Sequence, residues 1–145
     1  MRTIALRFGE HFSPECGTIT AHQQVIDEIG YVWYGKMGNP IATRIMEELS
    51  LLDDTKILLI NSGKADRYWA HISEIMKETP DLNGIPEYYR DLTDKFKTWF
   101  KVTRFDPAPR DIMSKCYVVS SGAVLGDVSK HSMSLYFIIN YDERR

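Results

Sequence analysis

The order of apolar and polar positions predicts an opening strand and then a helix. Residues 2–8 (RTIALRF) are rich in strand-forming side chains and stop at a glycine. A helix is predicted to begin near Thr20, which has capping-box spacing to Gln23, and to end at Gly30. Its buried face is predicted to consist of Ala21, Val25, Ile26 and Ile29.

A second strand and a second helix are predicted next. Residues 31–35 (YVWYG) favour a strand, and Asn39 as N-cap with Pro40 at the first helical position predicts a helix start. The buried stripe of that helix is predicted to contain Ile41, Ile45, Met46, Leu49 and Leu52. The unbroken apolar run 56–60 (KILLI) is typical of a central strand covered on both faces.

Beyond this point the pattern predicts strands and no further long helix. A loop at 61–67 leads into the alternating residues 68–77, which indicates a hairpin, and 79–94 reads as a long loop. The remaining predicted elements are a strand at 96–105, a helical turn at 110–114, a strand at 116–119 and a last strand at 133–141 that pairs with the first. The predicted fold class is α+β, a small curved or partly closed mixed β-barrel with two early helices.

Composition fits one domain spanning residues 1–145. The chain is 43% hydrophobic and 26% charged, and it shows neither repeats nor low-complexity tracts. Cys16 and Cys116 are far apart and lack CxxC spacing, so neither a disulfide framework nor a zinc site is expected, and a cytoplasmic location fits best. No apolar run is long enough for a membrane span or a signal peptide, so no membrane association is expected.

The charge balance argues against strong nonspecific binding to nucleic acid. The formal net charge is −2 and the pI is near 6.1. Between residues 95 and 115, however, the sequence contains six basic residues and two acidic ones. This local excess of positive charge is compatible with one basic surface and also with an ordinary scatter of charges. The six basic residues are Lys95, Lys97, Lys101, Arg104, Arg110 and Lys115.

Motifs for catalysis, metal binding or cofactor binding are absent from the sequence. The four histidines lack HExxH spacing, and the chain contains no GxSxG elbow, Walker loop or GxGxxG motif. We therefore expect no cofactor and no metal, and we assign no catalytic residue. Two alternatives stay open: a small-ligand sensor or minor hydrolytic enzyme with His71 or Asp66 as acid or base, and a protein-interaction domain with an exposed aromatic patch.

Aromatic residues are concentrated in and beside the predicted loops. Neighbours such as Trp33 and Tyr34 cannot both point to the same face of a strand. One of them must reach either an outer layer of the fold or a pocket that stacks a flat or cationic ligand.

The order of these motifs resembles the PUA-like superfamily, in particular its YTH and EVE branches. The resemblance spans most of the chain and is also carried by the stretch 94–109 (DKFKTWFKVTRFDPAP). The earlier segments that carry it are YVW (31–33), NPIATRIMEEL (39–49), KILLINSG (56–63) and RYWAHISEI (67–75).

That resemblance implies a binding module that holds a modified nucleobase, in nucleic acid or as a nucleotide, inside an aromatic cage. YTH domains bind an N-methylated adenine of RNA, and EVE domains are associated with modified DNA bases. The implied cage residues are Trp33, Tyr34, Tyr88, Tyr89 and Phe96, of which Phe96 stands where YTH domains place a tryptophan. The implied polar contacts to the base edge are Asn61 and Ser62, and the implied phosphate contacts are Lys36, Lys97, Lys101 and Arg104.

Overall fold

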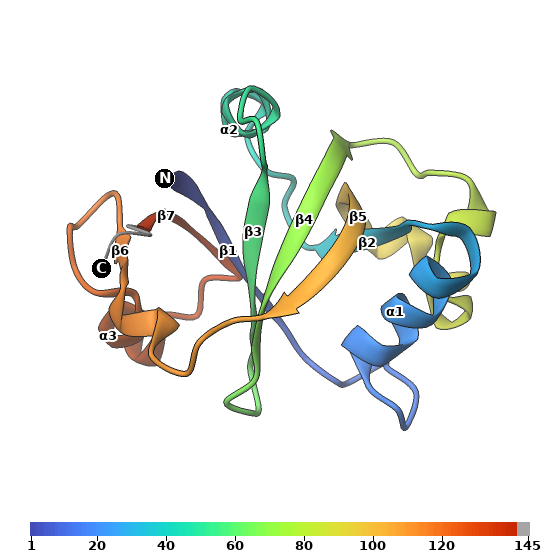
Figure 1. Ribbon diagram of the computed structural model, residues 1–145, viewed down its shortest axis with the longest axis horizontal. Helices are drawn as coiled ribbons and strands as arrows, with labels where there is room; N and C mark the ends of the chain where they lie inside the picture. The colour runs from blue at the N-terminus through green and yellow to red at the C-terminus, as the bar shows by residue number, and fades with distance from the viewer. Residues whose placement is uncertain (142–145) are drawn as a thin grey trace.

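A curved seven-stranded sheet organises residues 1–141, the part of the chain that the computed structural model describes (Figure 1). The strands are β1 (Arg2–Phe8), β2 (Val32–Met37), β3 (Lys56–Asn61), β4 (Arg67–Met76), β5 (Phe96–Pro107), β6 (Cys116–Val118) and β7 (Tyr136–Tyr141). Their order across the sheet is β2-β5-β4-β3-β1-β7-β6. Only β1 and β3 run parallel, so the sheet is mixed, and the edges at β2 and β6 leave it open. The predicted α+β class is confirmed.

Strand pairing follows the predictions closely. β3 lies at the centre, between β1 and β4, and its residues from Ile57 to Asn61 are buried. β3 and β4 form the predicted hairpin, with Leu58 opposite Trp69. The last strand pairs antiparallel with the first, with Ile4 opposite Ile138.

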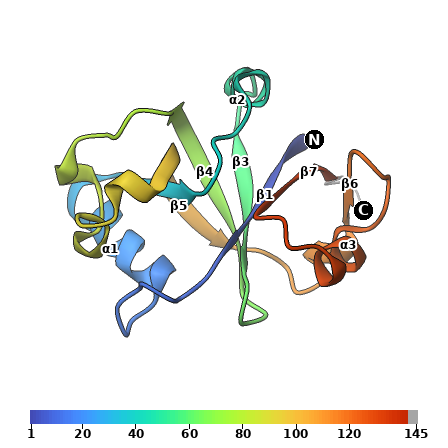
Figure 2. The same cartoon turned by 180° about the vertical axis from the view of Figure 1, so that it is seen from behind.

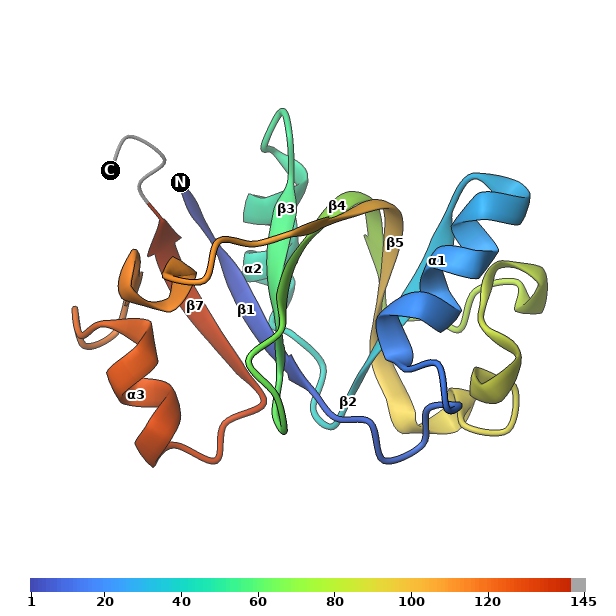
Figure 3. The same cartoon turned by 60° about the horizontal axis from the view of Figure 1, so that its bottom comes forward.

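Three helices lie around the sheet: α1 (Thr18–Ile29), α2 (Thr43–Ser50) and α3 (Leu125–His131). α1 lies beside β2 and β5, α2 lies by one end of β3, and α3 lies beside β6 and β7 (Figures 2 and 3). The third helix is absent from the sequence prediction. It has seven residues and buries only Leu125, so it leaves almost no periodic apolar pattern.

Helix α1 begins earlier than predicted, and its cap comes from a distant residue. The N-cap is Gly17, whose φ of 92° suits a glycine, and Thr18 is the first helical residue. The Glu10 carboxylate accepts hydrogen bonds from the Thr18 backbone N–H (2.9 Å) and hydroxyl (3.0 Å). The predicted capping box at Thr20 is therefore wrong, because a carboxylate eight residues upstream of Thr18 satisfies the helix start.

Helix α2 begins later than predicted, at Thr43 with Ala42 as N-cap. Asn39 and Pro40 precede it in non-helical backbone. Ile41 explains the delay, because its side chain is fully buried and its N–H donates to the Thr98 hydroxyl (3.0 Å) on β5. That tertiary contact holds the segment extended, so the local Asn-Pro signal does not decide where the helix starts.

The long loop predicted at 79–94 packs as a layer over one face of β2 and β5. It contains three short 3₁₀ turns, η1 (Leu82–Gly84), η2 (Glu87–Tyr89) and η3 (Thr93–Lys95). A fourth turn, η4 (Ile112–Ser114), lies where a helical turn was predicted.

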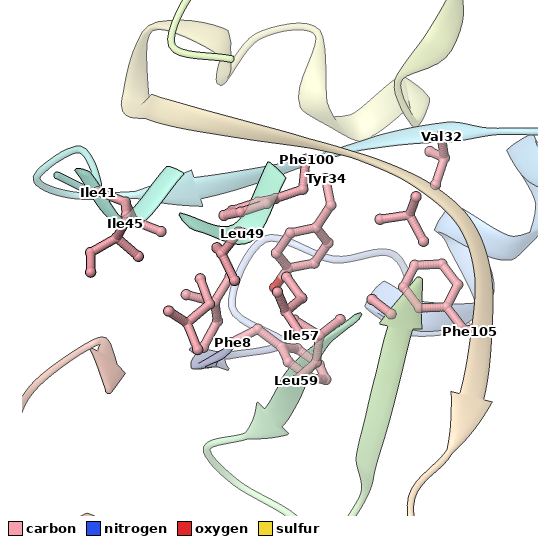
Figure 4. Packing of buried hydrophobic residues seen from close by; sticks show 14 residues of the cluster. Phe8, Val32, Tyr34, Ile41, Ile45, Leu49, Ile57, Leu59, Phe100 and Phe105 are labelled. Carbon is pink, nitrogen blue, oxygen red and sulfur yellow. The ribbon is translucent and has the colours of Figure 1, made fainter. Parts of the chain in front are cut away.

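The two faces of β2 carry different aromatic residues. Tyr34 points into the concave side of the sheet, and Figure 4 shows its side chain extending from β2 toward Ile57 and Leu59. Trp33 points the other way and packs with Ile85 beneath the 82–89 layer. The neighbouring aromatic pair is thus divided between the main core and an outer layer, as the alternation of a strand requires.

Candidate functional site

A cavity of about 220 Å³ opens where the curved sheet fails to close, between the end of β1 and the edge strand β2. Its floor and sides come from both strands, from the loop that follows β1, from η2 and from the start of β5. The volume lies below the roughly 300–1,000 Å³ typical of drug-sized ligand sites, so the cavity suits one small ring system. The lining residues used below are Arg7, His11, Phe12, Tyr34, Gly35, Lys36, Ser62, Tyr88, Tyr89, Phe96 and Leu135.

Four of the five predicted cage residues line this cavity: Tyr34, Tyr88, Tyr89 and Phe96. Tyr89 and Phe96 pack against each other with ring centroids 4.3 Å apart and planes inclined by 36°. Tyr88 meets Tyr89 edge-on at 4.9 Å. The 79–94 layer and β5 therefore present one continuous aromatic wall, with Tyr34 contributed separately by β2.

Gly35 lets this wall approach the strand edge. A Cβ at this position would lie 2.5 Å from Cγ of Phe96, a distance that a real side chain cannot adopt. The Gly35 N–H donates to the Tyr89 hydroxyl (3.3 Å) and so points away from β5. In an antiparallel pair the N–H and C=O of one residue point to the same side, so the Gly35 carbonyl also faces the open edge. The strand thus offers a backbone acceptor beside the aromatic rings.

Behind the wall lies His22, which is fully buried on α1. Its ring centroid is 5.2 Å from that of Tyr34 and 4.9 Å from that of Tyr89. Nδ1 is 2.8 Å from the Thr18 carbonyl, so it must be the protonated nitrogen, and Nε2 has no hydrogen-bond partner within residues 1–141. Burial lowers the pKa of His22 to about 4, so the imidazole is neutral at physiological pH.

His22 was not predicted as a site residue. A single histidine on an apolar helix face lacks metal-binding spacing and therefore gives no signal in the sequence.

The hydroxyl groups of the wall are neutral as well. Burial raises the pKa of Tyr88 to about 12, and burial also raises the pKa values of Tyr34 and Tyr89 well above 10. Neutral phenols can donate and accept hydrogen bonds, which suits recognition of an uncharged polar ring edge.

Two cations border the cavity, and no carboxylate is among its lining residues. Arg7 donates to the carbonyls of Ser132 (2.7 Å) and Ser129 near the end of α3. Lys36 donates to the carbonyls of Met37 (3.1 Å) and Asn39 (2.8 Å), and burial lowers its pKa. Within residues 1–141 neither side chain forms a salt bridge with a carboxylate. The lining residues by themselves therefore favour an anionic ligand over a cationic one, while the Glu10 carboxylate lies directly behind the lining residues Ser13 and Thr18.

Trp33, the fifth predicted cage residue, does not line the cavity. It is nearly buried under η1, where a Cβ on Gly84 would lie 2.8 Å from its ring. It belongs to the same apolar cluster as Tyr89 and Phe96 and so supports the wall from behind.

The two predicted polar contacts separate at the end of β3. Ser62 lines the cavity, whereas Asn61 is buried next to it and donates to Glu10 (3.3 Å). Asn61 also accepts from the Gly63 N–H (2.9 Å). Its amide is thus occupied in holding the loop after β1.

Three of the four predicted phosphate contacts lie on β5, outside the cavity lining. The Lys101 ammonium lies 4.4 Å from the ring centroid of Tyr31, and Arg104 pairs with Asp106 (3.1 Å). Lys97 is exposed. Of the predicted set, only Lys36 borders the cavity.

A second, more polar cavity of about 390 Å³ adjoins the first on the other side of Glu10, and Asp66 is one of its lining residues. His71 lines neither cavity; it contacts Asp106 (2.8 Å) and Asp54 (3.3 Å) on the surface of the sheet. The two residues considered as acid or base in the enzyme alternative therefore do not converge on one site.

Glu10 is held by more contacts than any other carboxylate near the site. It accepts from Ser13, Thr18 and Asn61. Burial acts to raise the pKa of Glu10. Hydrogen bonds from Ser13 and Thr18, together with the charge of Lys64, outweigh burial and lower the pKa. Glu10 therefore links the loop after β1 to α1 and to the end of β3.

Neither a metal cluster nor a membrane-spanning helix is found in the described part of the chain. Over residues 1–141 no three His, Cys, Asp or Glu side chains gather closely enough to hold a metal ion. Over the same residues no helix is both long and apolar enough to cross a membrane.

Comparison with protein families matches the chain to a family described as Pua-like, over residues 4–142. The chain belongs to the Pua-like family. Pua-like domains often bind nucleic acids, and the cavity at the open edge of the sheet lies within the matched region. No curated protein and no solved structure matches the chain. The wider superfamily predicted from the sequence is thus confirmed.

Proposed function

We propose that this Pua-like domain binds a modified nucleobase, in nucleic acid or as a nucleotide, in the cavity between β1 and β2, in the manner of YTH and EVE domains. The observation that carries the proposal is the composition of the cavity. Among the residues that the structure describes, its lining combines a wall of neutral aromatic rings with two cationic residues and no carboxylate. A nucleotide has the matching parts, a flat uncharged ring and an anionic phosphate.

The aromatic wall supplies the main binding energy in this proposal. Stacking of a base on an aromatic side chain contributes roughly 1–3 kcal/mol. Tyr88, Tyr89 and Phe96 offer ring surface, and Tyr34 closes the opposite side from β2. An added methyl group on the base would increase the apolar contact with these rings by about 0.8 kcal/mol when fully buried.

Recognition of the polar ring edge falls to neutral groups. The Gly35 carbonyl, the Ser62 hydroxyl and the phenols lie around the cavity and provide both donors and acceptors. Lys36 then acts on the phosphate through its charge, because two of its three N–H groups are already bound to backbone carbonyls. Arg7 adds positive charge from a greater distance, because its guanidinium bonds to the Ser129 and Ser132 carbonyls outside the cavity lining.

The test is calorimetric titration of the full chain with a panel of nucleosides and nucleotides. The panel contains N6-methyladenosine, 5-methylcytidine, their deoxy forms, the matching monophosphates and the unmodified parents. We expect one modified compound to bind at least several-fold more tightly than its unmodified parent. Equal binding of every modified and unmodified pair, or no binding at all, would overturn the proposal.

Two variants connect that binding to the cavity. Phe96→Leu keeps an apolar side chain but removes the ring. Tyr88→Leu also removes a ring, at a half-buried position where a substitution disturbs the packing less than at the buried Phe96. Either should weaken binding about 5- to 100-fold, which corresponds to the stacking energy of one ring. Tyr117→Leu, on the exposed edge strand β6 and outside the cavity, should bind like the unmodified chain.

A further inference from the structure

An aromatic side chain projects from the rim of the cavity into solvent. Phe12 lines the cavity, yet it is 47% exposed. The His11 ring meets Phe12 edge-on, with centroids 5.0 Å apart and planes inclined by 86°, and it also lines the cavity. A single ring bound inside the cavity would leave the outer part of Phe12 in water.

The turn that carries Phe12 is fixed at both ends. Glu10, before the aromatic pair, accepts from Thr18 at the start of α1 and from Asn61 at the end of β3. Ser13, after the pair, donates to the Glu10 backbone carbonyl (3.0 Å) and to its carboxylate. The turn that carries the ring is therefore held in place before a ligand arrives, which lowers the ordering entropy lost when a base stacks on Phe12.

A second exposed apolar side chain also lines the cavity. Leu135 is 46% exposed and lies beside Gly38, where an added Cβ would come within 3.2 Å of the leucine. Arg7 lines the same cavity, but its guanidinium is turned toward the end of α3, where it donates to the Ser132 carbonyl and lies 5.4 Å from the ring centroid of Phe137. The mouth thus offers an aromatic ring and an apolar side chain.

We propose that the ligand of this cavity is a base within a polynucleotide strand, and that Phe12 stacks on the base adjacent to the one held inside. The proposal rests on the proposed function and narrows it, because it excludes a free nucleotide as the preferred ligand. A strand that turns one base into the cavity brings a second base and the linking phosphate to the mouth. Phe12 supplies the ring face for that second base.

The test combines three forms of the ligand with the unmodified chain and Phe12→Ala. The ligands are the best-bound nucleoside of the panel, a trinucleotide with that base in the middle, and the same trinucleotide with abasic sites on both sides. Stacking on Phe12 predicts that the substitution weakens the complete trinucleotide about 5- to 100-fold. It should weaken binding of the nucleoside and of the abasic trinucleotide by a clearly smaller factor, because only the inner part of Phe12 lines the cavity. Tyr117→Ala, another exposed aromatic substitution, should change none of the three.

The outcomes separate this inference from the function on which it rests. If the nucleoside binds but Phe12→Ala affects all three ligands equally, or affects none, the stacking role is overturned while the cavity proposal stands. If the complete trinucleotide binds no better than the nucleoside, the preference for a strand is overturned. If no member of the panel binds the unmodified chain, the proposed function fails and this inference fails with it.

Discussion

Acid should destabilise this protein well above the pH at which carboxylates titrate, because His22 is buried in its neutral form. The pKa of His22 is lowered from 6.5 to about 4 by burial. Between these values the unfolded chain binds a proton at this histidine and the folded chain does not. The free energy of unfolding therefore falls as the pH drops below 6.5. The contribution of His22 to this fall ends below about pH 4.

The size of the effect follows from the two pKa values. Each pH unit between them corresponds to 1.36 kcal/mol, so the full loss is about 3 kcal/mol. At pH 5 the loss relative to pH 8 should already be about 2 kcal/mol. This is a large part of the roughly 5–15 kcal/mol by which domains are usually stable.

Urea unfolding at pH 8, 6 and 5 measures this dependence directly. His22→Phe keeps a ring of similar shape and removes the titrating group, so it should lose about 2 kcal/mol less than the unmodified chain between pH 8 and pH 5. His22→Gln serves as a second non-titrating variant if the phenylalanine does not fold. His131→Gln, at an exposed histidine, should leave the pH dependence unchanged. Equal pH dependence in the His22 variants and the unmodified chain would refute the buried neutral imidazole.

Three further predictions concern the wall, the loop after β1 and the cysteines. Gly35→Ala should cost about 1–3 kcal/mol in urea unfolding and weaken ligand binding, because the new methyl group overlaps the Phe96 ring. Glu10→Gln should cost about 1 kcal/mol at neutral pH, as the loss of a helix cap does. The difference from the unmodified chain should shrink as the pH falls below 4.5, because the unfolded chain then binds a proton at Glu10 while the lowered pKa keeps the folded carboxylate ionised to lower pH. A thiol reagent should label the exposed Cys16 in the native protein and Cys116 only after unfolding, because Cys116 is buried and burial raises its pKa to about 11.

Matched controls make these outcomes decisive. Gly63→Ala places a methyl group 3.8 Å from its nearest neighbour and should be nearly neutral. Glu15→Gln removes a carboxylate from the same loop as Glu10 and should leave stability within about 0.5 kcal/mol. If Gly35→Ala or Glu10→Gln is as stable as its control variant, the contact assigned to that residue does not contribute to stability. Native labelling of two thiols at equal rates would contradict the burial of Cys116.

Much of the fold could be predicted because the apolar patterns that indicate strands in the sequence coincide with the strands of the folded sheet. The apolar run 56–60 became the central strand, and the last strand pairs with the first, since both are dictated by alternation and burial. The starts of α1 and α2 could not be predicted. Both depend on contacts distant in sequence, Glu10 with Thr18 and Ile41 with Thr98, which local capping rules do not include.

The candidate site was predictable to a similar degree. The grouping of the aromatic residues into one site was implied by the resemblance to the PUA-like superfamily, but which member of a neighbouring pair faces the cavity depends on strand register. Tyr34 therefore lines the cavity while Trp33 supports it from the outer layer. His22 and Arg7 were missed because their roles arise only when α1 and β1 pack beside β2.

The measurement that most directly tests the binding cavity is a ¹H–¹⁵N spectrum of the labelled chain titrated with the best-bound nucleoside of the panel. The account predicts saturable shifts of the backbone amides of Gly9, Gly35 and Ser62, which border the cavity, with the Gly126 amide on α3 unmoved. Saturable binding that shifts amides elsewhere and leaves those of Gly35 and Ser62 unchanged would contradict it.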